Sequence, residues 1–294
     1  MSNGQWYPPE WPDRIRALAA GELTAATPRR AATVMLLRDS AAGTGDGPTV
    51  HMLRRRTSMA FAGGAYAYPG GGVDPRDDDR LVGWAGPALE DWAKRLGVGT
   101  PAEAQAIVCA AVRETYEEAG VLLAGPTAGT VVTDTTGADW EADREALVAR
   151  ELSFAEFLDR RGLVLRSDLL GAWARWITPE FEPRRYDTWF FVAALPVGQR
   201  TRNASTEADR TVWIGPAEAA DGYDRGELLM MPPTVSTLRA LRPYASAAQA
   251  LEAASGQDLA PVLAQARLEG EELVLSWPGH EEFTKHIPAG GGSA

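Results

Sequence analysis

Cysteine and histidine are scarce in this chain, which has one cysteine and three histidines among its 294 residues. A single cysteine excludes an internal disulfide and a cage of several thiolates around a metal ion. The lack of nitrogen and sulfur ligands argues against a zinc site. Cys109 falls on the apolar face of a predicted helix, where we interpret it as a buried small hydrophobe.

Long apolar runs and an excess of positive charge are also missing. No apolar stretch approaches the roughly 18 residues of a membrane span, and residues 1–11 lack a basic segment followed by an apolar one. The formal net charge of −11 disfavours non-specific binding to nucleic acid or to anionic membranes. We therefore expect a cytoplasmic protein with no nucleic-acid partner and no membrane partner. The sequence leaves a homodimer open.

Acidic residues are concentrated in the stretch Arg-Glu-Thr-Tyr-Glu-Glu-Ala-Gly-Val at 113–121. A capping box at 100–103 and a glycine at 120 predict a helix over 101–119. At 100° per residue, Glu114, Glu117 and Glu118 share an arc of roughly 100°. The opposite face carries an apolar stripe, which consists of Val108, Cys109, Val112, Tyr116 and Ala119. The three carboxylates are therefore expected to face a cleft or solvent, with Arg113 as the one counter-charge inside the stretch.

This acidic stretch resembles the signature of the Nudix hydrolases, in which Arg-Glu-apolar-x-Glu-Glu-x-Gly-apolar follows a glycine and a further glutamate. Thr115 stands at the apolar place. Counting back by the family's spacing leads to Gln105 instead of the further glutamate, whereas the usual Pro-Gly-Gly turn stands at 69–71. The signature is therefore interpreted as split by about thirty inserted residues, 73–100. Gln105 and Glu103 are the two candidates for the residue that replaces the missing glutamate.

The segment before the Pro-Gly-Gly turn resembles the motif of Nudix coenzyme A diphosphatases. The residues that carry this resemblance are Arg55, Arg56, Gly64 and Tyr68. Ala60 stands where that motif has an arginine, and Phe61 is similar to the acyl-coenzyme A diphosphatase branch, which also has a long insertion in its signature. The series around Arg184, Arg185 and the following Tyr-Asp-Thr resembles the same branch. The resemblance implies that these residues bind the substrate, and guanidinium groups suit phosphate.

The resemblance implies an α/β (α+β) fold of the Nudix type, an α/β/α sandwich with a mixed sheet. We expect an N-terminal arm at 1–28, a Nudix domain at 29–245 with its insertion at 73–100, and a helix and hairpin extension with a flexible tail at 246–294. The predicted strands are 31–38, 49–56, 121–123, 170–178 and 188–195, with a hairpin at 266–277. Besides 101–119, the predicted helices include 81–96, with a break near residues 86–87, and also 153–161 and 246–266.

The resemblance also implies a metal-dependent hydrolase that cleaves a nucleoside diphosphate derivative with Mg²⁺ or Mn²⁺. Clustered carboxylates bind these ions through oxygen. Glu117 and Glu118 are expected to ligate the metal, close to the carbonyl of Gly70 or Gly71. Glu114 would be a further ligand or the base, oriented by Arg113. A loop glutamate, Glu207, matches the place from which many family members bring a further ligand or base, and Asp209 is the reserve candidate.

Two classes of function stay open at this point. Coenzyme A or acyl-coenzyme A is the leading substrate of a hydrolase, with ADP-ribose, a dinucleotide or a nucleotide sugar as alternatives. The second class is a Nudix-fold binding or regulatory module without catalysis, which the split signature and Gln105 favour. The complete set of Glu114, Glu117 and Glu118 argues for the enzyme.

Overall fold

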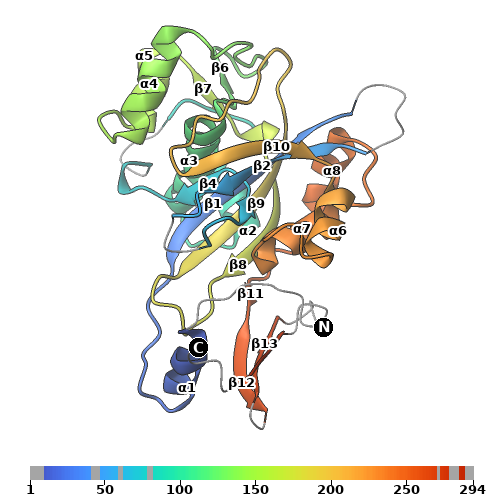
Figure 1. Ribbon diagram of the computed structural model, residues 1–294. Coiled ribbons are helices and arrows are strands. Elements are labelled where there is room, and N and C mark those ends of the chain that lie inside the picture. The colour runs from blue at the N-terminus through green and yellow to red at the C-terminus, as the bar shows by residue number, and fades with distance from the viewer. Residues whose placement is uncertain are drawn as a thin grey trace.

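The computed structural model describes residues 10–40, 47–58, 62–77, 82–269, 272–277 and 285–288. Its main sheet has the strand order β10-β2-β1-β9-β8-β11, with the short β3 beside β2 and the short β4 beside β1 (Figure 1). The strands are β1 Arg29–Arg38, β2 Thr49–Arg55, β3 Tyr66–Ala67, β4 Gly70–Gly72, β8 Gly171–Ile177, β9 Tyr186–Ala194, β10 Ala208–Ile214 and β11 Val262–Leu263. β1 is parallel to β9 and β8 to β11, and the other pairs are antiparallel. The sheet is mixed, as predicted.

Side chains of β1 alternate between two hydrophobic cores, one on each face of this sheet. Val34 and Leu36 belong to the core that contains α3 (Pro101–Ala119). Met35 and Leu37 belong to the core that contains α6 (Pro216–Asp224), α7 (Pro232–Leu241) and α8 (Ala247–Ala253). A strand covered on both faces requires a continuous apolar run, which β1 has. Helices lie on both faces in Figure 1, and the predicted α/β/α sandwich is confirmed.

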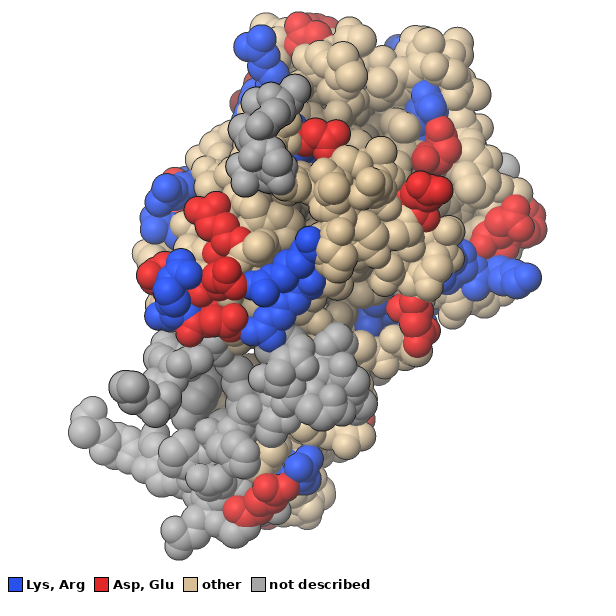
Figure 2. All heavy atoms as spheres, turned by 90° about the vertical axis from the view of Figure 1, so that its right-hand side faces the viewer, with Lys and Arg blue, Asp and Glu red and all other residues tan. Residues whose placement is uncertain are grey.

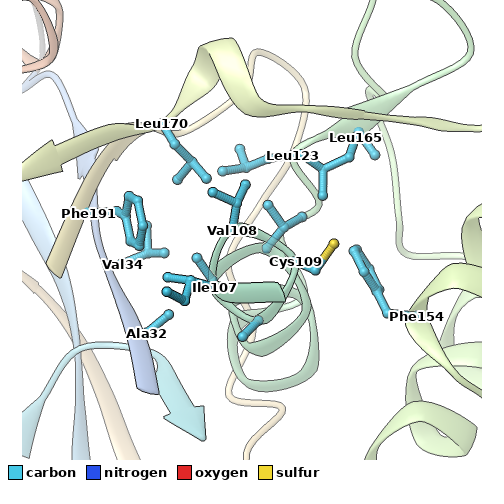
Figure 3. Close-up of a cluster of buried hydrophobic side chains, with 14 of the residues drawn as sticks. Ala32, Val34, Ile107, Val108, Cys109, Leu123, Phe154, Leu165, Leu170 and Phe191 are labelled. Atoms are coloured by element: carbon cyan, nitrogen blue, oxygen red, sulfur yellow. The ribbon is translucent and has the colours of Figure 1, made fainter. Parts of the chain in front are cut away.

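The helix α3 is buried on more sides than its sequence predicted. The expected apolar stripe is buried, but so is every residue from 104 to 113. Figure 3 shows Val34 and Phe191 of the sheet on one side of α3 and Phe154 of α5 (Phe154–Arg160) on the other side. Close packing on several sides holds α3 rigidly. The acidic end of this helix therefore occupies a fixed position relative to the sheet.

The outer layer over α3 comes from the segments before and after that helix. It contains α2 (Leu89–Leu96), α4 (Ala138–Val148), α5 and a small sheet of β5 (Trp84–Ala85), β7 (Val164–Arg166) and β6 (Ala124–Gly125). Tyr116 of α3 stacks on Phe157 with ring centroids 5.2 Å apart, and its hydroxyl donates to Trp140 O at 2.7 Å. Aromatic contacts of this kind add to the area that packing buries. The insertion thus serves as part of the cover over α3.

The small α1 (Trp11–Ala19) packs against the loop before β9. Trp11 lies edge-on to Phe181 at a centroid distance of 5.2 Å, and Arg14 Nε donates to Phe181 O at 2.6 Å. Beside α1 lies an antiparallel sheet of β12 (Gln265–Glu269), β13 (Glu272–Ser276) and β14 (Lys285–Pro288) (Figure 1). The predicted hairpin is confirmed, whereas β14 was not predicted.

Three predicted elements were wrong in extent or kind. The helix predicted over 81–96 begins only at Leu89, because residues 84–85 pair with β7 instead. The helix predicted over 246–266 ends at Ala253, since the chain turns and then extends into β11. In both cases pairing with a distant strand overrides local helix propensity.

The strand predicted over 121–123 was also wrong, because the paired segment begins at Ala124, directly after the predicted strand ends. Residues 121–123 are fully buried without being part of a strand. Gln199 holds this segment, since its Oε1 accepts from Leu122 N and its Nε2 donates to Leu122 O, both at 2.8 Å. A buried side-chain amide thus replaces a neighbouring strand as the partner of this backbone.

Charged side chains of both signs occur together on the surface. On the face shown in Figure 2 acidic and basic residues lie beside one another at several places and much of the surface is uncharged. Ion pairs of this kind join α6 to α7, where Arg239 Nη2 lies 2.6 Å from Asp224 Oδ1. Within the described ranges, no helix has the length and apolar character that crossing a bilayer requires.

The start of α3 provides a first prediction. Thr100 accepts a hydrogen bond from Glu103 N, and the Glu103 side chain accepts from Thr100 N, which completes the capping box. Thr100→Ala is expected to lower the free energy of unfolding by about 1 kcal/mol in a urea titration. Thr133→Ala, at an exposed threonine outside any helix, is the matched control. Equal losses in the two variants would contradict the role of the cap.

Candidate active site

The acidic end of α3 lines a pocket that the loops around β4 and β10 complete. Three glutamates, Glu114, Glu117 and Glu118, line it together with Arg113. The other lining residues are Arg29, Arg30, Gly72, Val73, Asp74, Pro75, Arg76, Leu147, Val148, Arg150, Tyr186, Ala204, Ser205, Thr206 and Glu207. The predicted position of the acids in a cleft agrees with this geometry.

Arg113 is buried, and its hydrogen bonds link two of the glutamates to Asp77 and to the backbone of β4. Its Nη1 donates to Glu114 Oε1 at 2.8 Å and to Glu117 Oε1 at 3.2 Å. Its Nε and Nη2 donate to the two carboxylate oxygens of Asp77, each at 3.0 Å, and Nη2 also donates to Gly72 O. The side chains of Arg113 and Asp77 are 8% and 1% exposed. A two-pronged pair of this kind is among the strongest that side chains form.

Asp77 supplies the acidic residue that appeared to be missing from the signature. It follows Gly71 with five residues between them, the family's spacing from glycine to glutamate. Neither Gln105 nor Glu103 takes its place. Gln105 is buried near the start of α3, about two turns before Arg113. Glu103 caps the same helix and pairs with Arg30. Counting forward from the Pro-Gly-Gly turn would have found Asp77, because the insertion lies after it and not before it.

Glu114 lies against the backbone of Gly71, where no side chain could fit. A Cβ on Gly71 would stand 2.5 Å from Glu114 Oε1, so a larger residue there would displace the Glu114 carboxylate. Burial raises the pKa of Glu114 to about 7, with Arg113 acting in the opposite direction. Burial likewise raises the pKa of Glu117, and Arg113 opposes this shift too. Both acids therefore lack full compensation of their charge.

Glu118 is held by groups other than Arg113. Its Oε2 accepts from Gly70 N at 2.9 Å, and Ser205 Oγ donates to its Oε1 at 3.4 Å. Burial, together with the neighbouring Glu114, raises the pKa of Glu118 to about 8. Of the three glutamates, Glu118 thus depends most on a cation from outside the protein, since no ion pair with it occurs among the described residues.

The three carboxylates fit a hard divalent cation by their chemistry. They are oxygen donors on one pocket wall, and the raised pKa values of Glu114 and Glu118 indicate uncompensated negative charge. In their present rotamers, no three acidic, histidine or cysteine side chains of the described chain converge closely enough to coordinate one ion. Coordination would require Glu114 or Glu117 to leave Arg113, which keeps its bidentate bond to Asp77.

The loop before β10 brings one of its two predicted acids to the pocket. Glu207 lines the pocket with a side chain that is 58% exposed, and its Oε2 lies 3.8 Å from Arg55 Nη2. Asp209 instead accepts from Arg54 Nε at 2.7 Å and does not line the pocket. The reserve candidate is therefore engaged elsewhere, and Glu207 stays the candidate from this loop.

The predicted substrate residues before the Pro-Gly-Gly turn have different surroundings in the structure. Arg55 is near Glu118 and Glu207, whereas Arg56 is exposed next to it. Gly64 has a φ of 80°, which permits the turn into β3. Tyr68 was wrong as a substrate contact, because it is 4% exposed and its hydroxyl contacts Thr234 and Thr237. Phe61 lies outside the described residues.

Arg184 and Arg185 also have different surroundings. Arg184 is exposed and does not line the pocket. Arg185 is buried, and it donates to Thr178 O at 3.0 Å and to Ala26 O at 2.7 Å. Arg185 was predicted to hold a phosphate, but its side chain is buried, joins two loops and does not line the pocket. The sequence could not distinguish a structural arginine from a binding one.

Thr115, the polar residue at an apolar place of the signature, is fully buried. Its hydroxyl donates to Ala111 O at 2.8 Å, four residues earlier in the helix. A threonine can occupy an apolar site when its hydroxyl bonds back to the helix in this way. The departure from the signature therefore leaves the helix intact.

A family model for the NUDT19 Nudix domain matches residues 85–241, just over half of the chain. The chain belongs to the Nudix family. A Nudix hydrolase from Alicyclobacillus acidocaldarius has the same fold, with a TM-score of 0.65 and 28% identity over 80% of this chain and 99% of that one. Both findings agree with the Nudix resemblance of the acidic stretch at 113–121.

Two curated Nudix relatives are named acyl-coenzyme A diphosphatase NUDT19. The match to the protein from Gallus gallus is 28% identical and covers 62% of this chain and 57% of that protein. The match to the protein from Homo sapiens is 28% identical and covers 66% of this chain and 60% of that protein. The chain therefore spans less than two thirds of the length of these relatives. Nudix hydrolases generally use divalent metal ions.

The Nudix signature supplies a second prediction, on stability. Asp77→Asn removes the charge opposite buried Arg113 at nearly constant shape. Breaking a buried ion pair costs about 3–5 kcal/mol, and we expect about 3 kcal/mol because Glu114 and Glu117 remain bonded to Arg113. The measurement is the free energy of unfolding from denaturant titration.

Asp209→Asn is the control for this prediction, because it breaks an exposed ion pair with Arg54 and should change the stability little. If Asp77→Asn and Asp209→Asn are equally stable, Asp77 does not hold Arg113.

Proposed function

We propose that this Nudix protein is a metal-dependent hydrolase that cleaves the diphosphate bond of coenzyme A or acyl-coenzyme A. The products would be 4′-phosphopantetheine or its acyl form and adenosine 3′,5′-bisphosphate. The observation that carries the proposal is the set of three glutamates with raised pKa values on one wall of an arginine-lined pocket. The names of the curated relatives support the substrate class.

Glu117 and Glu118 would hold Mg²⁺ or Mn²⁺, with the carbonyl of Gly71 nearby. Such an ion neutralises phosphate oxygens and lowers the pKa of a bound water. Glu114 would be a further ligand or accept the proton of the attacking water, and Glu207 is the other candidate for that base. Arg113 would orient Glu114 and Glu117 while its bond to Asp77 keeps it in place.

Arginines around the acids would hold the substrate's phosphates. Arg55 lies beside Glu207, and the pocket lining includes Arg29, Arg30, Arg76 and Arg150. Planar guanidinium groups match phosphate oxygens in pairs. A site that gathers carboxylates and guanidinium groups suits a diphosphate bridged to a metal ion. ADP-ribose, a dinucleotide or a nucleotide sugar has the same diphosphate and is the alternative substrate class.

We further propose that residues 29–245 form the catalytic unit, with the described parts of the arm and of the C-terminal extension packed on it. Contacts of Trp11 and Arg14 with Phe181 support this division for the arm. Burial of Ala250 in the core below the sheet supports it for the extension.

The third prediction concerns Glu118, the glutamate without an ion pair. Glu118→Gln removes one charge at nearly constant shape and should lower kcat with Mg²⁺ or Mn²⁺ by at least tenfold, which is about 1.4 kcal/mol of barrier. Products from a panel of coenzyme A esters, ADP-ribose and dinucleotides are identified by mass spectrometry.

Glu145→Gln, at an exposed position on α4, is the control and should keep full activity. Activity of Glu118→Gln within a factor of ten of the wild type would defeat the assignment of the metal site. No turnover of any compound on the panel, together with no metal binding, would favour a non-catalytic binding module.

The fourth prediction concerns the choice of substrate. If Arg55 contacts the 3′-phosphate of coenzyme A, dephospho-coenzyme A should have a kcat/KM lower by one to two powers of ten, since a charge-assisted contact contributes about 1.5–3 kcal/mol. Arg55→Ala should narrow this difference, and Arg56→Ala should narrow it if Arg56 makes the contact instead. Equal rates on both compounds, or faster cleavage of ADP-ribose than of any coenzyme A ester, would contradict this substrate.

A further inference from the structure

Exposed apolar side chains gather at the pocket. Three large apolar residues of the described chain are prominently exposed, and two of them, Tyr186 and Val148, line the pocket with exposed fractions of 40% and 42%. The third, Val197, is 90% exposed and does not line it. Both Tyr186 and Val148 are therefore accessible to a molecule that occupies the pocket.

The two exposed groups differ in chemistry and come from different elements. Tyr186 begins β9 and offers an aromatic ring, whereas Val148 ends α4 next to Leu147 and offers an aliphatic surface. Planar nucleobases stack on aromatic side chains. A flexible aliphatic chain has no planar face that could stack on a ring. The sheet side of the pocket is therefore the better match for a nucleobase.

An arginine without a partner stands directly beside Tyr186. Arg29 and Tyr186 are paired in register on the parallel strands β1 and β9, so that their side chains leave the sheet on the same face, which by the alternation along β1 is the face of Met35 and Leu37. Each is the first residue of its strand, and both line the pocket from this end of the sheet. Among the arginines that line the pocket, Arg30, Arg76, Arg113 and Arg150 are all in ion pairs. Arg29 has no ion pair and no side-chain hydrogen bond within the described chain. It is available for an anion.

Backbone contacts hold this pair in place before any ligand binds. Arg29 N donates to Arg185 O at 2.9 Å, and Tyr186 N donates to Thr178 Oγ1 at 3.0 Å. Thr178 N donates to Tyr186 O at 2.9 Å, while Arg185 bonds Thr178 O and Ala26 O. A site whose groups are already fixed loses less entropy when it binds. The buried Arg185 thus acts as a positioning residue for its exposed neighbour.

We propose that Tyr186 and Arg29 form the subsite for the nucleotide half of the substrate. The Tyr186 ring stacks on the nucleobase and the Arg29 guanidinium binds a phosphate of the same nucleotide. This assignment rests on the proposed diphosphatase function for the identity of the substrate. It distinguishes the wall that receives the base from the wall of Leu147 and Val148, which remains for the rest of the substrate.

The test is the affinity of the full chain for adenosine 3′,5′-bisphosphate, measured by calorimetry. Tyr186→Ala should raise Kd about 5- to 150-fold, the range for loss of one base stack, while Tyr186→Phe keeps the ring and should stay within threefold of the wild type. Arg29→Ala should raise Kd about tenfold or more and should reduce its dependence on salt. Val197→Ala, outside the pocket, should leave Kd unchanged.

Ribose 5-phosphate, which has no base, should bind equally to the wild type and to Tyr186→Ala. Wild-type affinity in Tyr186→Ala, or no measurable binding of the bisphosphate to the wild type, would overturn the subsite. The outcome is separable from that of the proposed reaction. Cleavage of coenzyme A with a KM that Tyr186→Ala leaves unchanged sinks the subsite alone, whereas ring-dependent binding without cleavage of any substrate supports the subsite and sinks the reaction.

Discussion

The bond between Arg113 and Asp77 is the interaction on which the acidic pocket depends. A guanidinium buried to this degree would be costly without partners, and Asp77 satisfies two of its donors while remaining almost inaccessible to solvent. The remaining donors reach Glu114, Glu117 and Gly72 O. With Arg113 anchored on Asp77, the two glutamates can exchange its N–H groups for another cation without leaving the arginine unpaired.

At this site the packing is complete, whereas the negative charge of the glutamates is only partly compensated. Packing on several sides of α3 fixes the helix, and the close approach of Gly71 to Glu114 fixes the turn against it. The electrostatic balance is left incomplete, since burial and mutual repulsion raise the pKa values of Glu114 and Glu118. Functional sites are where such unbalanced charge is found, because a ligand completes it.

Much of the fold followed from the sequence because its signals are local. The bounds of α3 were predicted from a capping box and a terminal glycine, and both are present. The strands β1 and β2 and the hairpin β12 and β13 were predicted from β-type runs and turn residues. Helices predicted over 81–96 and 246–266 were shortened by pairing with strands far away in the sequence, which no local pattern reports.

The site was predicted in part for the same reason. Glu114, Glu117 and Glu118 are neighbours on one helix, so that their meeting in a pocket could be foreseen. Asp77 was missed because the count ran backwards through an insertion. Tyr68 and Arg185 looked like ligand contacts by residue type, but burial and existing hydrogen bonds show otherwise. Burial depends on the whole fold and cannot be read from a motif.

The most direct measurement is the binding of Mn²⁺ to the full chain, followed by titration calorimetry or by the electron paramagnetic resonance of the free ion. The wild type should bind Mn²⁺ at a saturable site, and a variant with Glu114→Gln, Glu117→Gln and Glu118→Gln together should lose that site while staying folded. Equal Mn²⁺ affinity in the two proteins would contradict the account, because the carboxylates of α3 would then not be the ligands.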